Sequence, residues 1–247
     1  MNESTNVGFL NRNQIKWIAI AAMLIDHIAW AFVPTESVLG QIMHFIGRLT
    51  APTMAYFLAE GYHYTKNINK YIRRLLIFAV ISWPAFVYFE FGCAVVSFDG
   101  GFWIYPQFGV IYTLLLGLMA IRLWDNENRP KWLKVLGVIG LCILSFVGDW
   151  PIYLVLWCLL FHIYRDNAKK KWTAYTIVAI ACCLMMLLMS IPWWTSLFMM
   201  GVFLTPLLIQ FCYNGEQGSK SPINKWFFYV FYPLHLVILG IIRWVLI

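Results

Sequence analysis

The chain has 247 residues, of which 62% are hydrophobic and only 12% are charged, and its mean hydropathy is +0.71. A soluble globule needs more polar surface than this composition supplies, so most soluble folds are excluded and a polytopic membrane protein is favoured. The net charge of +7 is interpreted first as a signal of membrane topology and second as an attraction for an anionic substrate or lipid headgroups, and nucleic-acid binding is the weakest interpretation.

Apolar runs of about 20 residues, each long enough to cross a bilayer, follow one another along the chain. Division at charged, proline and glycine clusters predicts nine helices, at 14–33, 39–62, 71–92, 102–124, 131–148, 150–164, 172–190, 194–213 and 224–246. The exact count over residues 131–164 stays open, because two short runs meet there. Pro52 and Pro233 lie inside predicted helices and are expected to kink them.

These runs predict an all-α fold, a polytopic integral membrane bundle of about nine transmembrane helices, with residues 1–247 forming a single domain. With a cytoplasmic N-terminus, the basic clusters at residues 66–74, 122–134 and 165–171 all lie on the cytoplasmic side. The opposite loops contain acids such as Glu36 and Glu90 and almost no base. This asymmetry predicts a cytoplasmic N-terminus by the positive-inside rule.

Ionisable side chains lie near the middle of three predicted helices. At ~1.5 Å per helical residue, the pair Asp26–His27 on the first helix, Arg48 on the second and His235 on the last fall in one layer near the midplane. Such groups are costly at that depth, so a function is their default explanation, although an Asp–Arg pair can also simply join helices. His44 lies one turn from Arg48, and the sequence leaves open whether His44 or His235 is the second catalytic group.

This layer suits proton transfer, because histidine accepts and returns a proton near neutral pH. Neighbouring helical residues point about 100° apart, so we expect Asp26 to hold Arg48 or a backbone group while His27 faces a cavity. The sequence has no Gly-x-Ser-x-Gly elbow. A direct transfer is therefore favoured, in which His27 deprotonates an incoming amine or hydroxyl and Arg48 or His235 stabilises the oxyanion.

Two other classes of protein are compatible with parts of this pattern. A proton- or ion-coupled small-solute carrier also places ionisable groups at the midplane, but the sequence shows no duplicated halves. A non-catalytic assembly factor would use the aromatic faces but would leave the ionisable layer unexplained. No metal site is expected, because the six cysteines have no metal-type spacing.

Five segments together resemble the TraX family, and they stand in that family's order over nearly the whole chain. They are Leu24–Ile28, Gly47–Pro52, Leu58–Tyr62, Tyr213–Gly215 and Lys225–Leu236. The family includes the conjugative pilin acetylase and is similar to the acyltransferase-3 type of membrane acyltransferases. The resemblance therefore implies a multi-pass acetyltransferase of the bacterial inner membrane that takes the acetyl group from cytoplasmic acetyl-CoA. The implied acceptor is the N-terminal amine of a pilin subunit, with a cell-envelope glycan as the alternative.

The resemblance also assigns residues. It places the early-helix histidine at His27 with Asp26 beside it, the Gly-Arg-Leu arginine at Arg48, the helix-end glutamate at Glu60 and the Tyr-Pro-x-His histidine at His235. Glu60 is then expected near the cofactor mouth. We expect the phosphates of acetyl-CoA to bind a cytoplasmic basic cluster, composed of Lys66, Lys70, Arg73 and Arg74. The acceptor and the oligomeric state are not specified by the sequence.

Overall fold

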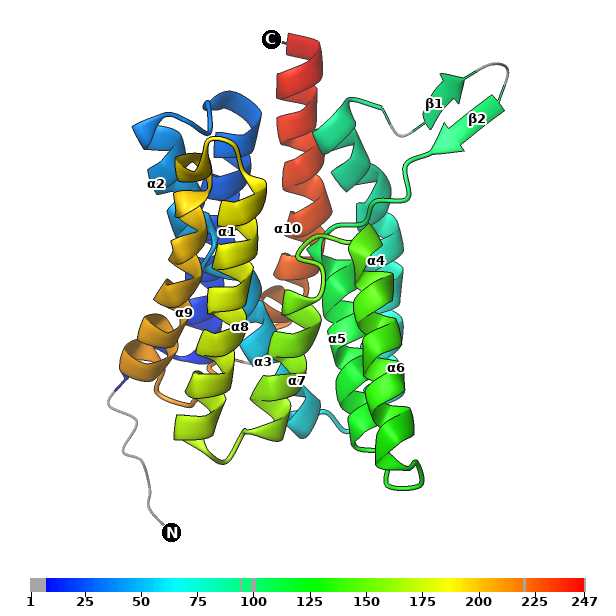
Figure 1. Cartoon of the computed structure of the whole chain (residues 1–247), viewed down its shortest axis with the longest axis vertical. Coiled ribbons are helices and arrows are strands. Elements are labelled where there is room, and N and C mark those ends of the chain that lie inside the picture. The colour runs from blue at the N-terminus through cyan, green and yellow to red at the C-terminus, as the bar shows by residue number, and fades with distance from the viewer. Residues whose placement is uncertain (1–7, 94, 99–100, 220, 247) are drawn as a thin grey trace. The chain divides into compact units, whose positions relative to one another are not determined.

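The computed structural model describes residues 8–93, 95–98, 101–219 and 221–246, and most of them lie in helices (Figure 1). The chain divides into two compact units. Unit 1 comprises Met1–Phe57 and Thr176–Phe228, and unit 2 comprises Leu58–Tyr175 and Tyr229–Ile247. The expectation that residues 1–247 form a single domain stays a prediction.

Unit 1 is built around the contacts of α2 with α1 and with a long 3-10 helix, η2. Its elements are α1 (Arg12–Phe32), α2 (Val38–Gly47), the first part of α3 (Thr50–Tyr64), the last part of α8 (Ala168–Met189), η2 (Trp193–Phe203), α9 (Leu204–Leu207), the π-helical turn η3 (Leu208–Cys212) and the start of α10 (Pro222–Ile241). A capping box begins α1, because the side chains of Asn11 and Gln14 each accept a hydrogen bond from the other's backbone N–H.

Unit 2 is built around α5, which packs against α4, α6 and α7. Its elements are the rest of α3, α4 (Ile68–Phe91), β1 (Val95–Phe98), β2 (Gly101–Ile104), α5 (Val110–Trp124), α6 (Lys131–Leu144), the 3-10 turn η1 (Ser145–Val147), α7 (Tyr153–Ile163), the first part of α8, the rest of α10 and the π-helical turn η4 (Ile242–Leu246). Most residues of α5 are buried, and they lie on every face of the helix, as expected for a helix without a polar face.

The predicted helical class is confirmed, with one short addition. Strands β1 and β2 form an antiparallel hairpin in which Val95 pairs with Ile104 (Figure 1). The helix predicted over 102–124 is therefore wrong at its start, because residues 102–104 belong to β2 and α5 begins only at Val110. Each of the nine predicted ranges contains a helix in the structure, although several are shorter or broken.

Five helical segments of the described chain are long and apolar enough to cross a membrane. They are Arg12–Phe32, Ile68–Phe91, Ala168–Met189, Trp193–Cys212 and Trp226–Leu246. Two further apolar helices, Val110–Trp124 and Tyr153–Ile163, are shorter. The chain is therefore described as a membrane protein with several spanning helices, while nine spans and a cytoplasmic N-terminus stay predictions.

The range predicted as one helix over 39–62 is two helices. The first, α2, ends at Gly47 with Arg48 as its C-cap, and α3 begins at Thr50. Pro52 consequently lies in the first turn of α3, where its missing N–H would have no helical partner. The kink predicted at Pro52 is thus replaced by a break just before it, whereas Pro233 lies inside α10 as expected.

Candidate functional site

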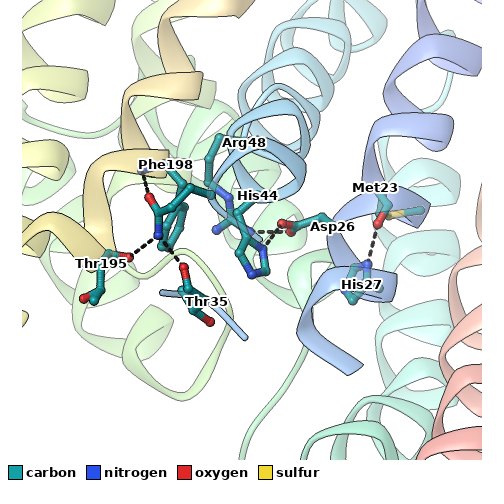
Figure 2. A network of polar contacts seen from close by, with 9 residues as sticks. Met23, Asp26, His27, Thr35, His44, Arg48, Thr195 and Phe198 are labelled. Atoms are coloured by element: carbon teal, nitrogen blue, oxygen red, sulfur yellow. Dashed lines mark hydrogen bonds and ion pairs between the residues drawn. The ribbon is translucent and has the colours of Figure 1, made fainter. Parts of the chain in front are cut away.

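The centre of the site is Asp26 of α1, which binds two side chains from the end of α2 (Figure 2). His44 Nδ1 donates a hydrogen bond of 2.8 Å to Asp26 Oδ1, and Arg48 Nη2 donates to Asp26 Oδ2. All three residues are buried. The predicted contact between Asp26 and Arg48 is therefore present, and His44 shares the same carboxylate. Because a carboxylate oxygen only accepts, this contact places the proton of the neutral His44 ring on Nδ1.

Helical spacing and a glycine bring these groups together. His44 and Arg48 are four residues apart and therefore lie on the same face of the chain at the end of α2. Gly47 lies between these two residues in the sequence, and a Cβ atom at Gly47 would overlap the Asp26 side chain. The absence of a side chain at this position lets α2 approach α1 closely enough for both hydrogen bonds.

The change Gly47→Ala is accordingly expected to destabilise the protein by roughly 1–3 kcal/mol, the typical cost of overpacking a well-packed site. The melting temperature of the purified variant measures this effect. Gly140→Ala is the matched control, because a Cβ atom there meets nothing within 4 Å. We expect the control to be neutral or slightly stabilising. Equal melting temperatures for the two variants would contradict the close approach of α2 to Asp26.

Aromatic rings cover the site. The ring centroids of Trp30 and Phe198 lie 4.3 and 5.1 Å from that of His44. The Arg48 guanidinium carbon lies 5.2 Å from the centre of the Phe198 ring. His44 is completely buried, at 0% exposure, and its Nε2 atom has no hydrogen-bond partner among the residues that the structure describes. The cluster therefore contains a basic nitrogen enclosed by apolar surface.

The amide of Gln41 fixes η2 against α2. Its Nε2 donates to the carbonyl oxygens of Thr35 and Thr195, at 2.7 and 2.9 Å, and its Oε1 accepts from the backbone N–H of Phe198 at 3.0 Å. A Cβ atom at Gly201 would overlap the backbone carbonyl of Phe45, so η2 also approaches α2 closely. These contacts hold the Phe198 ring in place over the cluster (Figure 2).

His27 lies beside Asp26 in the sequence but makes a different contact (Figure 2). Its Nδ1 lies 2.8 Å from the carbonyl oxygen of Met23, one turn earlier in α1. A carbonyl only accepts, so Nδ1 carries the proton and Nε2 carries the lone pair of the neutral ring. As expected from the 100° rotation between neighbours, the Asp26 carboxylate is directed toward α2.

His235 belongs to unit 2, whereas Asp26, His27 and Arg48 belong to unit 1. Its Nδ1 lies 2.8 Å from the carbonyl oxygen of Phe231, and its ring stacks on Phe231 with centroids 4.8 Å apart. The common layer expected for His235 and the other three residues stays a prediction.

The predicted cofactor residues lie in unit 2, at the end of α3 and the start of α4. Lys66, Lys70 and Arg73 are exposed. Arg74 is engaged within the unit, because its Nε donates to the Tyr229 hydroxyl at 3.1 Å and its guanidinium lies over two tyrosine rings. Glu60, at the end of α3, interacts electrostatically with Lys171. The three exposed bases are therefore better available for phosphates than Arg74.

A second polar cluster, which the sequence did not predict, joins the ends of α3, α5 and α7 in unit 2. His162 Nε2 donates to Asp125 Oδ1 at 2.7 Å, and His162 Nδ1 lies 3.2 Å from Nε2 of His63. The pKa of His63 is lowered mainly by its partial burial and, to a smaller extent, by the nearby positive charge of Arg165. These residues are far apart in the sequence, so no spacing signal points to their contact. Over the described part of the chain, no group of three or more potential ligands is placed to hold a metal ion.

Comparison with known proteins gives two matches. Residues 11–243 match the family described as "TraX protein". The "Probable fimbrial assembly protein FimC, serogroup H1" of Dichelobacter nodosus is 33% identical over 240 residues, which cover 96% of each chain. No solved structure is significantly similar to this chain.

Proposed function

Because this chain belongs to the TraX family, we propose that it is a membrane acetyltransferase that moves an acetyl group from cytoplasmic acetyl-CoA to an envelope acceptor. The preferred acceptor is the N-terminal amine of a pilin subunit, and the fimbrial name of the relative is compatible with this choice. One observation carries the proposal: a buried Asp26–His44–Arg48 cluster lies next to His27 on a helix apolar enough to cross a membrane. Ionisable groups in that environment call for a function.

In the proposed reaction His27 is the general base. The hydrogen bond from Nδ1 to Met23 fixes the tautomer, so Nε2 is the atom that takes a proton from the acceptor nitrogen and frees its lone pair for attack on the thioester carbon. Arg48, which is oriented by Asp26 and by the Phe198 ring, supplies positive charge for the oxyanion of the tetrahedral state. His235 is retained as a further candidate for the same stabilising role.

The phosphates of acetyl-CoA are assigned to the exposed bases at the start of α4. Replacement of Lys66, Lys70 and Arg73 by glutamine is expected to raise the KM for acetyl-CoA roughly tenfold or more, with little change in kcat, because phosphate contacts act in ground state and transition state alike. The rise should shrink as salt is added, since exposed charges are screened. Initial rates at several acetyl-CoA concentrations measure both effects.

A matched triple variant replaces three other exposed bases, Arg129, Lys131 and Lys169, by glutamine. This control should leave the KM for acetyl-CoA near the wild-type value. If both triple variants raise KM equally, the effect comes from net charge and the assignment to α4 is wrong.

Heat unfolding of the purified protein tests whether it uses acetyl-CoA at all. A ligand at 100 times its dissociation constant stabilises the folded state by about 2.7 kcal/mol, so saturating acetyl-CoA should raise the melting temperature by several degrees. A carrier for unrelated solutes or a non-catalytic assembly factor would show no such rise. An unchanged melting temperature would therefore refute the proposed donor.

A further inference from the structure

His44 is held like the histidine of a catalytic dyad. Its Nδ1–H donates to the Asp26 carboxylate at 2.8 Å, which leaves the lone pair on Nε2. That Nε2 atom is buried and has no hydrogen-bond partner among the described residues. A buried polar atom without a partner is costly, so its place in the site calls for an explanation. An incoming polar group would supply the missing partner.

The Asp26 carboxylate contacts the His44 ring directly, so it can stabilise the imidazolium that forms when Nε2 takes a proton. The last turn of α2 acts in the same direction through the helix dipole, and the positive charge of Arg48, which shares the carboxylate, acts against it. The Nδ1–H groups of His27 and His235 are each hydrogen-bonded to a carbonyl oxygen of their own helix, whereas that of His44 is hydrogen-bonded to a carboxylate. A hydrogen-bonded carboxylate both orients an imidazole and stabilises its protonated form.

We infer that His44, with Asp26 as its positioning residue, is the second proton-transfer group of the site, and this inference rests on the proposed acetyl transfer. An acceptor that arrives as an ammonium ion must lose two protons before it becomes an amide. His27 takes the first proton, which frees the nitrogen lone pair to form the N–C bond with the thioester carbon. The carbonyl π electrons move to oxygen in the same step.

His44 Nε2 takes the second proton, from the nitrogen of the tetrahedral intermediate. The C=O bond then re-forms, the C–S bond breaks, and Nε2 returns its proton to the departing thiolate. The products are the amide, the free thiol of coenzyme A and one proton, which leaves His27 for water. Because His44 is fully buried, the proposed step requires a neighbouring ring to move, and the Trp30 ring, which packs on His44 and is 40% exposed, is the candidate.

The change His44→Asn tests this role. The asparagine amide retains a donor for Asp26 at the position of Nδ1–H, but it has no basic atom at the position of Nε2. We expect kcat to fall roughly 100- to 10,000-fold, the usual contribution of general acid–base catalysis, with the KM for acetyl-CoA nearly unchanged. In His44→Ala, added imidazole should restore part of the lost rate, which a merely structural role would not allow.

His162→Asn is the matched control, since His162 is also hydrogen-bonded to an aspartate, at 2.7 Å, but lies in the second polar cluster. It should retain the wild-type kcat. A wild-type kcat in His44→Asn would overturn the inference and leave the proposed function intact. Wild-type protein that transfers no acetyl group would instead overturn the proposed function.

If the His44 variants do not fold, the wild-type protein still gives an answer. The chain contains five histidines, so their ring nitrogens can be resolved by NMR after labelling with ¹⁵N-histidine. In the neutral ring of His44, the proton should lie on Nδ1 and the lone pair on Nε2, as the hydrogen bond to Asp26 requires. The opposite tautomer, with the proton on Nε2, would overturn the inference, because Nε2 could then accept no proton.

Discussion

The change His27→Ala is expected to reduce acetyl transfer at least 100-fold while the protein still folds and inserts into membranes. General-base catalysis typically contributes 100- to 10,000-fold, and no other imidazole is assigned to the first proton. The effect on stability should be small. The His27 ring donates a hydrogen bond to the Met23 carbonyl of its own helix, and this carbonyl is also an acceptor of the α1 hydrogen-bond ladder, so it keeps a partner in the variant. Initial rates and melting temperatures, measured on the same preparation, separate the two effects.

His63→Ala is the matched control for this experiment, because it also removes an imidazole but lies in the second polar cluster of unit 2. It should retain the wild-type rate. If His27→Ala retains the wild-type rate as well, His27 is not the general base.

The change Asp26→Ala is expected to cost about 3–5 kcal/mol of stability, as is typical when one partner of a buried ion pair is removed. Asp26 uses both carboxylate oxygens, one for His44 and one for Arg48, so its loss deprives a buried guanidinium of its counter-charge. Activity should disappear together with stability. Unfolding free energies in mixed micelles measure the first effect, and transfer rates measure the second.

A double-mutant cycle with Arg48→Met isolates the ion pair. The double variant should lose clearly less free energy of unfolding than the two single variants together, because it leaves no buried charge without its partner. Strictly additive losses would show that Asp26 and Arg48 do not interact in the folded protein.

The parts of the fold and site that could be predicted depend on local sequence. The apolar run from Lys16 predicts α1 almost to its observed ends, because a long uninterrupted stretch has one structural solution in a bilayer. The Asp26–Arg48 contact follows from depth and charge, since a guanidinium in lipid must find an anion.

Features that depend on close approach between elements could not be predicted. The break between α2 and α3 occurs next to Gly47, where the backbone comes against Asp26, and hydropathy contains no such information. The same holds for η2, whose 3-10 geometry accompanies the approach of Gly201 to Phe45.

The His44–Asp26 hydrogen bond was not predicted, for a related reason. The sequence shows that His44 lies one helical turn from Arg48, but only the structure shows that the Asp26 carboxylate accepts a hydrogen bond from both side chains.

The most direct test is transfer of labelled acetyl from acetyl-CoA by the purified wild-type protein. The acceptors are a peptide with the free N-terminus of a pilin, the same peptide with its amine blocked, and an envelope glycan. If the proposed function is right, label appears on the free amine and none on the blocked peptide. Label on the glycan alone would change the acceptor. A folded protein that binds acetyl-CoA and labels none of the three acceptors would contradict the proposed acetyl transfer.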